Sequence, residues 1–184
     1  VFDLTTGEQL FQYQDEKLYR PASTEKVVTS VSALATLGTD YTMNTRLQYT
    51  GKIENDTLKG NLYLVGGFDP EFMDEDLDSL VNVIAQSGIR YISDTLAADV
   101  SMTDSIYWGT GWSWDDVPAS FQPYMSPLML NRGCVDVTVI PTQKDSLPQV
   151  ICVPASDYYQ VDNDGVSNNS QAGRLQITRN WLHH

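Results

Sequence analysis

The feature that most constrains the fold is a sharp change of pattern at Arg20-Pro21-Ala22. After this break, Val27 and Val31 stand four residues apart, and apolar residues continue at helical spacing up to a Leu-Gly pair at 37–38. Apolar residues at this spacing predict an amphipathic helix, and a glycine directly after the last apolar residue is a typical stop. We therefore expect a helix over residues 23–37.

The segment before the break has a different pattern. Residues 1–13 hold two short apolar stretches on either side of Thr5-Thr6-Gly7-Glu8, which predicts a β-hairpin with a glycine-containing turn. At the start of the helix, Ser23 or Ala22 occupies the place where an N-cap belongs.

From residue 41 onward the pattern becomes mostly that of short strands and turns. Gly51 and Asn55-Asp56 provide turn chemistry between two strand-like stretches. An amphipathic helix that ends at Gly88 interrupts them. The expected strands are 45–49, 59–65, 89–92 and 96–100, and the expected helix is 76–87.

The second half of the chain has a tryptophan-rich loop over residues 107–124, whose Trp108, Trp112 and Trp114 we interpret as packing anchors more than as ligand-stacking residues. Residues 135–140 and 149–153 predict a hairpin. A polar run over 162–173 predicts a loop, and the alternating stretch 175–181 predicts a strand.

Charge and hydropathy exclude some functions. The chain has 184 residues and a formal net charge of −13, which repels phosphate backbones, so we expect no nucleic-acid partner. Ten tyrosines and four tryptophans argue against disorder. No apolar run reaches the roughly 18 to 20 residues of a membrane helix, and we expect that any secretory leader has been removed.

Metal-ligating residues are sparse in the sequence. The two histidines are His183 and His184, and the two cysteines are Cys134 and Cys152, so metal chemistry has no support. The cysteines lie in the two strands of the expected second hairpin, which would place them opposite each other. We expect a disulfide, with two buried free thiols as the alternative.

The chemistry-bearing pattern is the S-x-x-K tetrad from Ser23 to Lys26. Residues three apart share a helix face, so the lysine can reach the serine hydroxyl. A serine is activated by a neighbouring base, and a lysine can act as that base where burial and the helix dipole disfavour its charged form. The backbone N–H of the serine would be one oxyanion donor. Alone, the tetrad is also compatible with a capping serine beside a solvated lysine.

The wider context resembles the class C low-molecular-mass penicillin-binding proteins, the D-alanyl-D-alanine carboxypeptidase/endopeptidase family. The stretches that carry the resemblance span most of residues 2–140: Asp3-Leu4-Thr5-Thr6-Gly7, Pro21-Ala22-Ser23-Thr24-Glu25-Lys26-Val27, Leu37-Gly38, Leu58-Lys59-Gly60-Asn61-Leu62, Gly67-Phe68-Asp69-Pro70 and Gly111-Trp112-Ser113-Trp114-Asp115-Asp116.

The resemblance implies roles for three residues. Ser23 would be the acylated nucleophile, Lys26 its general base, and Asp116 a contact for the amino group of the substrate's diamino acid, with a plain turn residue as the alternative for Asp116. The substrates would be peptidoglycan stem peptides, and β-lactam antibiotics would be inhibitors. No cofactor is implied, the location would be the periplasm or the outer face of a bacterial envelope, and a homo-oligomer is compatible with the sequence.

The resemblance also implies a fold and a domain division. The fold class would be α/β (α+β): residues 1–40 as part of a penicillin-binding transpeptidase-like catalytic domain, followed by a mostly β insertion over 41–184. The family also uses Ser-x-Asn and Lys-Thr-Gly motifs. Lys-Thr-Gly is absent here, and Ser167-Asn168-Asn169 lies in a polar run without a helix, so we reject it as the second motif. We therefore expect the 184 residues alone to be inactive, with the apolar face of the 23–37 helix uncovered.

Two other functions remain open from the sequence. Another S-x-x-K enzyme, a β-lactamase or esterase, would share the tetrad but not the long β insertion. A catalytically incompetent peptidoglycan-binding module would share the overall resemblance while lacking a complete active site.

Overall fold

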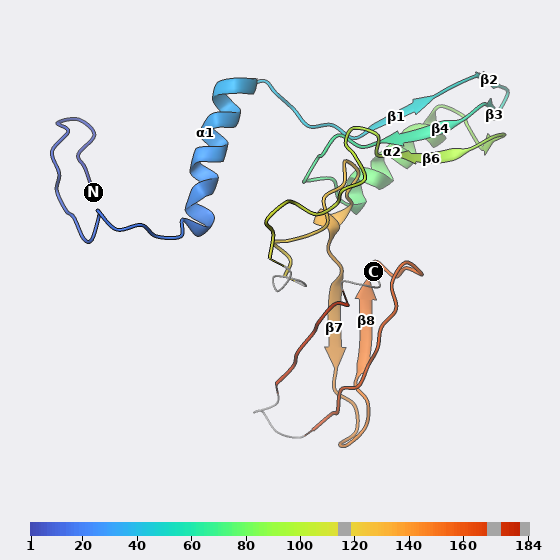
Figure 1. Ribbon diagram of the computed structural model, residues 1–184. Helices are drawn as coiled ribbons and strands as arrows, with labels where there is room; N and C mark the ends of the chain where they lie inside the picture. The colour runs from blue at the N-terminus through green and yellow to red at the C-terminus, as the bar shows by residue number, and fades with distance from the viewer. Residues whose placement is uncertain (114–118, 169–173, 181–184) are drawn as a thin grey trace. The chain divides into compact units, whose positions relative to one another are not determined.

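The computed structural model describes residues 1–113, 119–168 and 174–180. It divides into two compact units, Val1–Thr42 and Met43–His184, which Figure 1 shows in colours running from blue to red. The fold is a mixture of helices and small sheets, so the expected α/β class is confirmed.

The first unit begins with a turn in place of a full hairpin. Phe2 and Gln9 form an isolated antiparallel bridge, and no strand extends it. The Asp3 carboxylate accepts the backbone N–H groups of Thr5 and Thr6 at 2.7 and 3.3 Å, and these hydrogen bonds hold the pKa of Asp3 below its usual value. The sequence therefore predicted the turn, while the paired strands around it do not form.

A short 3₁₀ turn, η1 (Ala22–Thr24), leads into the first helix, α1 (Glu25–Leu37). The helix ends as expected at Gly38, whose φ of 82° a glycine adopts without strain and whose N–H bonds the Leu34 carbonyl. The expected N-cap at Ser23 or Ala22 is wrong. Because the 3₁₀ turn precedes the α-helix, the N-cap is Thr24, and its hydroxyl donates to the Pro21 carbonyl at 2.5 Å.

Within Val1–Thr42, the apolar face of α1 is not covered. Val27, Val31 and Leu34 are 65%, 60% and 58% exposed, and no residue of this helix is buried. The helical period that the sequence predicted is therefore present without the packing that usually stabilises such a face.

The second unit is built around a long hairpin. Strands β1 (Arg46–Tyr49) and β4 (Leu62–Val65) pair antiparallel, and β6 (Leu96–Asp99) lies parallel to β4, giving the order β1-β4-β6. Figure 1 shows these three strands side by side.

The same hairpin continues into a second small sheet. Strands β2 (Lys52–Glu54) and β3 (Thr57–Lys59) turn at Asn55, whose φ is 55°, and β5 (Tyr91–Ile92) pairs parallel with β3. The expected strand 45–49 is thus followed by a break, and the expected strand 59–65 is divided by one. The strands on either side of these breaks belong to two separate small sheets.

Two glycines make this break. A Cβ on Gly51 would lie 1.9 Å from the Lys59 carbonyl oxygen, and a Cβ on Gly60 would lie 2.0 Å from that of Thr50. The two strands therefore approach each other more closely here than any other residue type allows.

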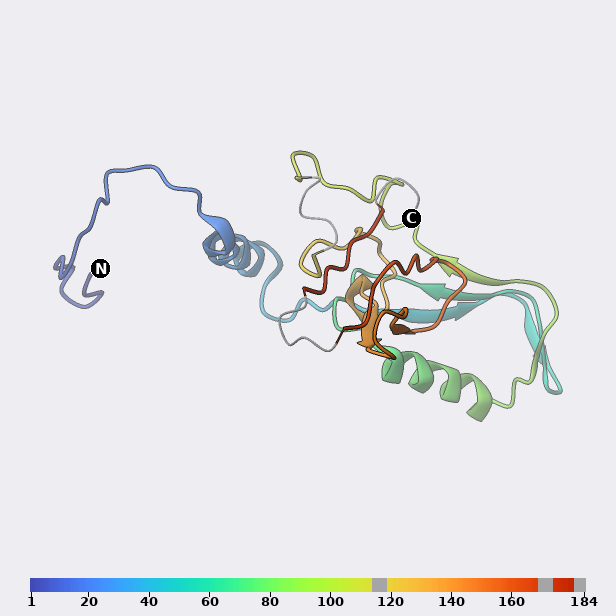
Figure 2. The same ribbon diagram turned by 90° about the horizontal axis from the view of Figure 1, so that it is seen from below.

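Helix α2 (Asp74–Gln86) runs along one face of the β1-β4-β6 sheet, as Figure 2 shows. Its first turn is fixed by the Asp76 carboxylate, which accepts the Met73 N–H at 3.0 Å. Leu58, Leu62 and Phe72 form the buried hydrophobic core of the described residues, and Pro127 is fully buried as well. The prediction of a helix that stops before Gly88 is confirmed, with a start two residues earlier than expected.

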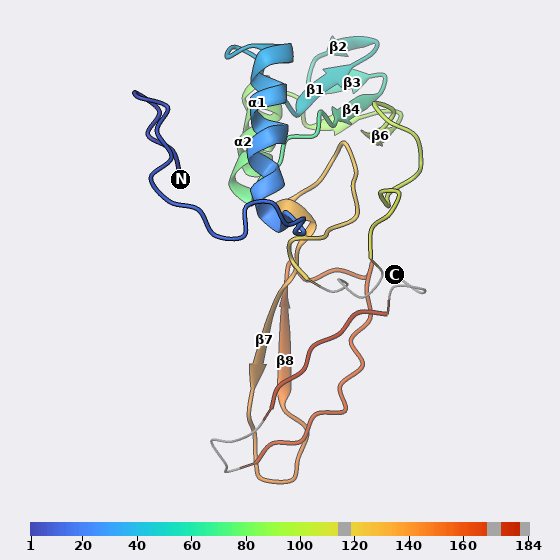
Figure 3. The same ribbon diagram turned by 60° about the vertical axis from the view of Figure 1, so that its left-hand side comes forward.

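Strands β7 (Asp136–Ile140) and β8 (Gln149–Val153) form the predicted second hairpin, which Figure 3 shows at its full length. The segment before it is tied to the start of α2. Arg132 forms a 3.1 Å salt bridge with Glu71, and the Asn131 side-chain oxygen accepts the Asp74 N–H at 3.2 Å.

The expected disulfide is wrong, because both cysteines are free. Cys152 pairs with Val137, whereas Cys134 stands two residues before Asp136. Since neighbouring residues of a strand point to opposite faces, this register places the two thiols on opposite sides of the hairpin. Cys152 lies close to Tyr159, and burial together with this neighbouring thiol raises the pKa of Tyr159.

The expected strand at 175–181 does not form in its described part, since residues 174–180 have no strand or helix. An alternating pattern needs a neighbouring strand that offers backbone partners, and no described strand pairs with these residues.

Candidate active site

Ser23 and Lys26 meet at the start of α1. The Lys26 Nζ lies 3.3 Å from the Ser23 Oγ, within hydrogen-bond distance. Ser23 belongs to the 3₁₀ turn, and Lys26 is the second residue of the α-helix, so the turn and the helix together provide the spacing. Of the residues proposed for catalysis, the structure brings these two together.

The backbone just before Ser23 has an unusual conformation. Ala22 has a φ of 46°, in the left-handed region that a residue with a Cβ rarely adopts. Such a residue costs about 1–2 kcal/mol, and strained residues of this kind cluster at functional sites. The chain therefore makes an abrupt turn immediately before the candidate nucleophile.

Within the first unit, the pair is not enclosed by other residues. Both Ser23 and Lys26 are exposed. A lysine is converted most readily to a neutral base by burial, and Val1–Thr42 does not supply that burial. The geometry for proton transfer is thus present, while a surrounding cavity is not formed by the first unit.

The third proposed site residue, Asp116, and the neighbouring Trp114 lie outside the described residues. Aromatic contacts join described parts of the same loop. Trp108 contacts Trp112 edge-on with ring centroids 5.4 Å apart, and it contacts Tyr124 in the same manner at 5.7 Å. Trp108 and Trp112 thus make aromatic contacts within the loop, and their interpretation as packing anchors more than ligand-stacking residues stays a prediction.

Sequence reasoning missed one member of this cluster, Arg179. Its guanidinium carbon lies 4.5 Å from the centre of the Tyr124 ring, which is a cation–π contact. The arginine is far away in the sequence and lies outside any recognisable motif, so neither spacing nor pattern could have placed it here.

The rejected Ser-x-Asn candidate has a structural role. Ser167 is buried, and its hydroxyl accepts the Thr142 N–H at 2.9 Å and lies 3.3 Å from the Thr142 Oγ1. These contacts fix the loop against the turn of the β7–β8 hairpin. Asn169 lies outside the described residues.

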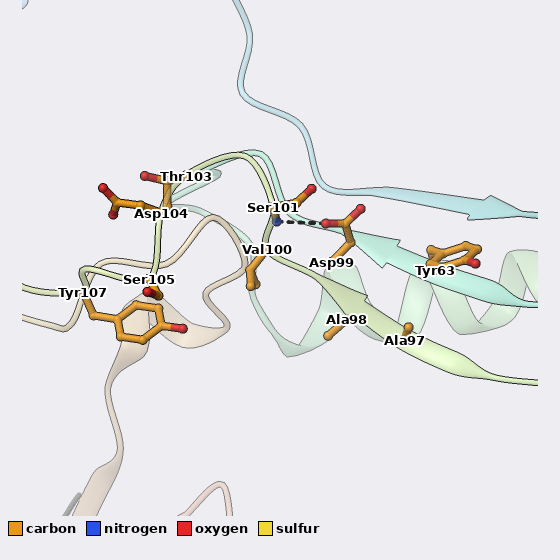
Figure 4. A pocket seen from close by; sticks show the side chains of 10 residues that line it. All are labelled: Tyr63, Ala97, Ala98, Asp99, Val100, Ser101, Thr103, Asp104, Ser105 and Tyr107. Carbon is orange, nitrogen blue, oxygen red and sulfur yellow. Dashed lines mark hydrogen bonds between the residues drawn. The ribbon is translucent and has the colours of Figure 1, made fainter.

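The second unit also has a shallow hollow at the end of β6, with a volume of about 410 Å³. Figure 4 shows its residues, including Tyr63, Asp99 and Tyr107. The Asp99 carboxylate accepts the Ser101 N–H at 2.9 Å, and hydrogen bonds from the Ser101 hydroxyl and N–H lower the pKa of Asp99. The hollow is lined by residues 63–107 alone and contains neither Ser23 nor Lys26.

Among the described residues, no three His, Cys, Asp or Glu side chains form a group that could hold a metal ion. Within the same residues, no helix has the length and apolar character needed to cross a membrane.

Comparison with known proteins identifies the same family that the Ser23–Lys26 tetrad and its context resemble. The model of the D-Ala-D-Ala carboxypeptidase 3 (S13) family matches residues 1–181. The chain is 30% identical over 186 residues to the D-alanyl-D-alanine carboxypeptidase of Actinomadura sp. (strain R39), covering 97% of this chain and 35% of that protein. It is also 30% identical over 132 residues to D-alanyl-D-alanine carboxypeptidase DacB of Haemophilus influenzae, covering 72% and 28%.

A solved structure has a similar fold. The crystal structure of penicillin binding protein 4 (dacB) from Haemophilus influenzae matches with a TM-score of 0.71 and 26% identity, over 81% of this chain and 33% of that one. The chain thus spans about a third of the length of the relatives that it matches. Because the family model matches almost the whole chain, the protein belongs to the D-Ala-D-Ala carboxypeptidase 3 (S13) family.

Proposed function

We propose that the protein is a serine-type D-alanyl-D-alanine carboxypeptidase that acts on peptidoglycan stem peptides through an acyl-enzyme at Ser23. The observation that carries this proposal is the 3.3 Å contact between Lys26 Nζ and Ser23 Oγ at the start of a helix, in a chain of the S13 family. Both relatives named above are D-alanyl-D-alanine carboxypeptidases.

In this mechanism Lys26 acts as the general base. Its neutral amine accepts the Ser23 hydroxyl proton while Oγ attacks the carbonyl carbon of the peptide bond before the terminal D-alanine. The peptide C–N bond then breaks, and the leaving amine takes up a proton. Water hydrolyses the resulting ester and regenerates the serine. The same sequence of steps on a crosslink between two stem peptides would make the enzyme an endopeptidase.

The substrate's side chain would be recognised by Asp116, whose carboxylate would pair with the free amino group of the diamino acid. A β-lactam would acylate Ser23 in the same way as a peptide and would act as an inhibitor. In support, the penicillin binding protein 4 from Haemophilus influenzae has been solved in complex with a β-lactam. A site in the periplasm or on the outer face of the envelope fits a peptidoglycan substrate.

The two parts of the sequence would have different roles. Residues 1–40 would belong to the catalytic domain, and residues 41–184 would form an insertion within it. The exposed Ser23 and Lys26 and the absence of Lys-Thr-Gly from the 184 residues support the proposal that this stretch alone is inactive. The remaining burial and the second oxyanion donor would come from other parts of the full-length protein.

The test is release of D-alanine by the full-length protein from a peptide that ends in D-alanyl-D-alanine. Ser23→Ala should lower the rate by roughly 10⁴-fold or more, because the nucleophile is lost. Ser30→Ala, an exposed serine on the same helix, is the matched control and should leave the rate unchanged. Undiminished release by Ser23→Ala would contradict the assignment. An absence of release by the unaltered protein would favour a peptidoglycan-binding module.

A further inference from the structure

The second unit has a cavity of about 480 Å³ between the start of α2 and the base of the β7–β8 hairpin. We call it the α2–β7 cavity. Its volume lies in the range of small-ligand sites in proteins. Its lining combines apolar side chains with charged groups of both signs: Met73, Asp74, Glu75, Arg132, Asp136 and Val153.

The wall of the cavity that carries Arg132 has an unusual backbone. The turn η3 (Asn131–Gly133) has positive φ angles of 52°, 59° and 65° at its three residues. Asparagine and glycine adopt this left-handed region readily, whereas arginine rarely does. The Asn131 N–H donates to the Phe72 carbonyl at 3.0 Å, and its side-chain oxygen accepts the Asp74 N–H at 3.2 Å. These hydrogen bonds hold the turn against the start of α2.

Stability does not explain an arginine at position 132. Its ion pair with Glu71 joins side chains that are 61% and 73% exposed, and exposed ion pairs contribute little to stability. A left-handed conformation at a residue with a Cβ destabilises the fold by more than such a pair usually stabilises it. Strained residues of this kind cluster at functional sites. A ligand for the guanidinium accounts for the arginine where the ion pair does not.

The guanidinium of Arg132 has N–H groups left for such a ligand. The Glu71 carboxylate accepts from Nη2 alone, at 3.1 Å to each oxygen. Within the described part of the chain, Nε and Nη1 form no hydrogen bond. A planar guanidinium suits a carboxylate in charge and geometry. The three carboxylates of the same lining, Asp74, Glu75 and Asp136, favour a positive group on the ligand.

We infer that the α2–β7 cavity binds a peptide zwitterion of dipeptide size. The ligand's carboxylate pairs with Arg132, and its ammonium lies among the carboxylates of Asp74, Glu75 and Asp136. The apolar Met73 and Val153 contact small side chains of the ligand. This inference does not depend on the proposed function, because the cavity contains neither Ser23 nor Lys26.

The free thiol of Cys134 provides a local probe, because it also lines the cavity. The experiment uses the full-length protein, treated first with penicillin so that a reactive Ser23 is blocked, and the probe ligand is D-alanyl-D-alanine. Saturating dipeptide should slow alkylation of Cys134 by N-ethylmaleimide roughly threefold or more, since a bound ligand covers the cavity wall. Cys152 is free and does not line the cavity, so its alkylation is the internal reference and should not change.

Three further ligands test the chemistry of recognition. The N-acetylated dipeptide lacks the ammonium, and the C-terminal amide lacks the carboxylate, so each should protect Cys134 only at concentrations at least roughly tenfold higher. Free D-alanine keeps both charges but is smaller than the cavity admits, and it should also protect more weakly. Equal protection by any of the three would overturn the assignment of a dipeptide-sized zwitterion.

A pair of variants separates ligand binding from the ion pair. Arg132→Gly should weaken dipeptide binding at least roughly tenfold in titration calorimetry, because a charge-assisted hydrogen bond is lost. It should lower the melting temperature by no more than about 2 °C, because glycine relieves the left-handed strain. Glu71→Gln removes the same ion pair but keeps the guanidinium, and it should bind the dipeptide within about twofold of the unaltered protein.

The results that would contradict the inference are specific. Absence of both Cys134 protection and a calorimetric signal, unchanged binding in Arg132→Gly, or an equal loss in Glu71→Gln would each overturn it. Failure of the proposed function looks different, since it would appear as no penicillin adduct at Ser23 and would leave the protection of Cys134 unaltered.

Discussion

Ser23 and Lys26 come within 3.3 Å of each other because a 3₁₀ turn leads directly into α1. The sequence indicated this spacing, since residues three apart share a helix face. It did not indicate the left-handed Ala22 that precedes the serine. Nothing in the residue type of alanine signals a positive φ, so that conformation had to be found in the structure.

The role of Lys26 can be tested by changing it to arginine in the full-length protein. Arginine keeps the positive charge but stays protonated, so it cannot accept the serine proton. The rate of penicillin acylation should fall by roughly 10²-fold or more, measured by intact-mass spectrometry over time. Lys17→Arg, at another exposed lysine of the first unit, is the control and should react normally. A near-normal rate in Lys26→Arg would mean that the lysine is not the base.

At the scale of secondary structure, Gly51 and Gly60 stand where the long hairpin passes from one small sheet to the other. They divide one long hairpin into two small sheets, and β5 and β6 then pair with different halves. A φ of 86° at Gly51 disfavours other residues, and the 1.9 Å between the Lys59 carbonyl oxygen and the position of a Cβ excludes them.

The importance of the close approach at Gly51 can be tested by Gly51→Ala in the 184-residue chain. We expect a loss of roughly 2–5 kcal/mol in the free energy of unfolding, from a steric clash and an unfavourable φ together. Gly88→Ala is the matched control, because Gly88 has a similar φ of 82° but open space around it, and it should cost about 1 kcal/mol. Chemical denaturation measures both changes. Equal losses in the two variants would show that the close approach at Gly51 does not matter.

The elements that the sequence predicted well are those fixed by local periods and turns. Helices α1 and α2, the turn at Asn55 and the β7–β8 hairpin all follow from such patterns. The predictions that were wrong depended on how strands distant in the sequence pair with each other. The disulfide depended on the register of β7 and β8, and the strand at 175–181 depended on a neighbour that is not there. Long-range pairing is specified by packing, which a local pattern does not contain.

At the scale of the whole molecule, the first unit does not by itself cover the apolar face of α1, and the described core is small. Ser23 lies in the 3₁₀ turn before that helix and Lys26 in its first turn, while the tryptophan-rich loop belongs to the second unit. The sequence indicated the catalytic pair because the tetrad is local. It could not indicate Arg179, because the contact with Tyr124 joins distant segments.

The central claim is that Ser23 is the acylated nucleophile of the full-length protein. The most direct measurement is intact-mass spectrometry after incubation with penicillin, followed by fragmentation to locate the adduct. We expect one penicillin added per chain, on the peptide that contains Ser23, and no adduct in Ser23→Ala. A covalent adduct that persists in Ser23→Ala, or that maps to a different residue, would contradict the account.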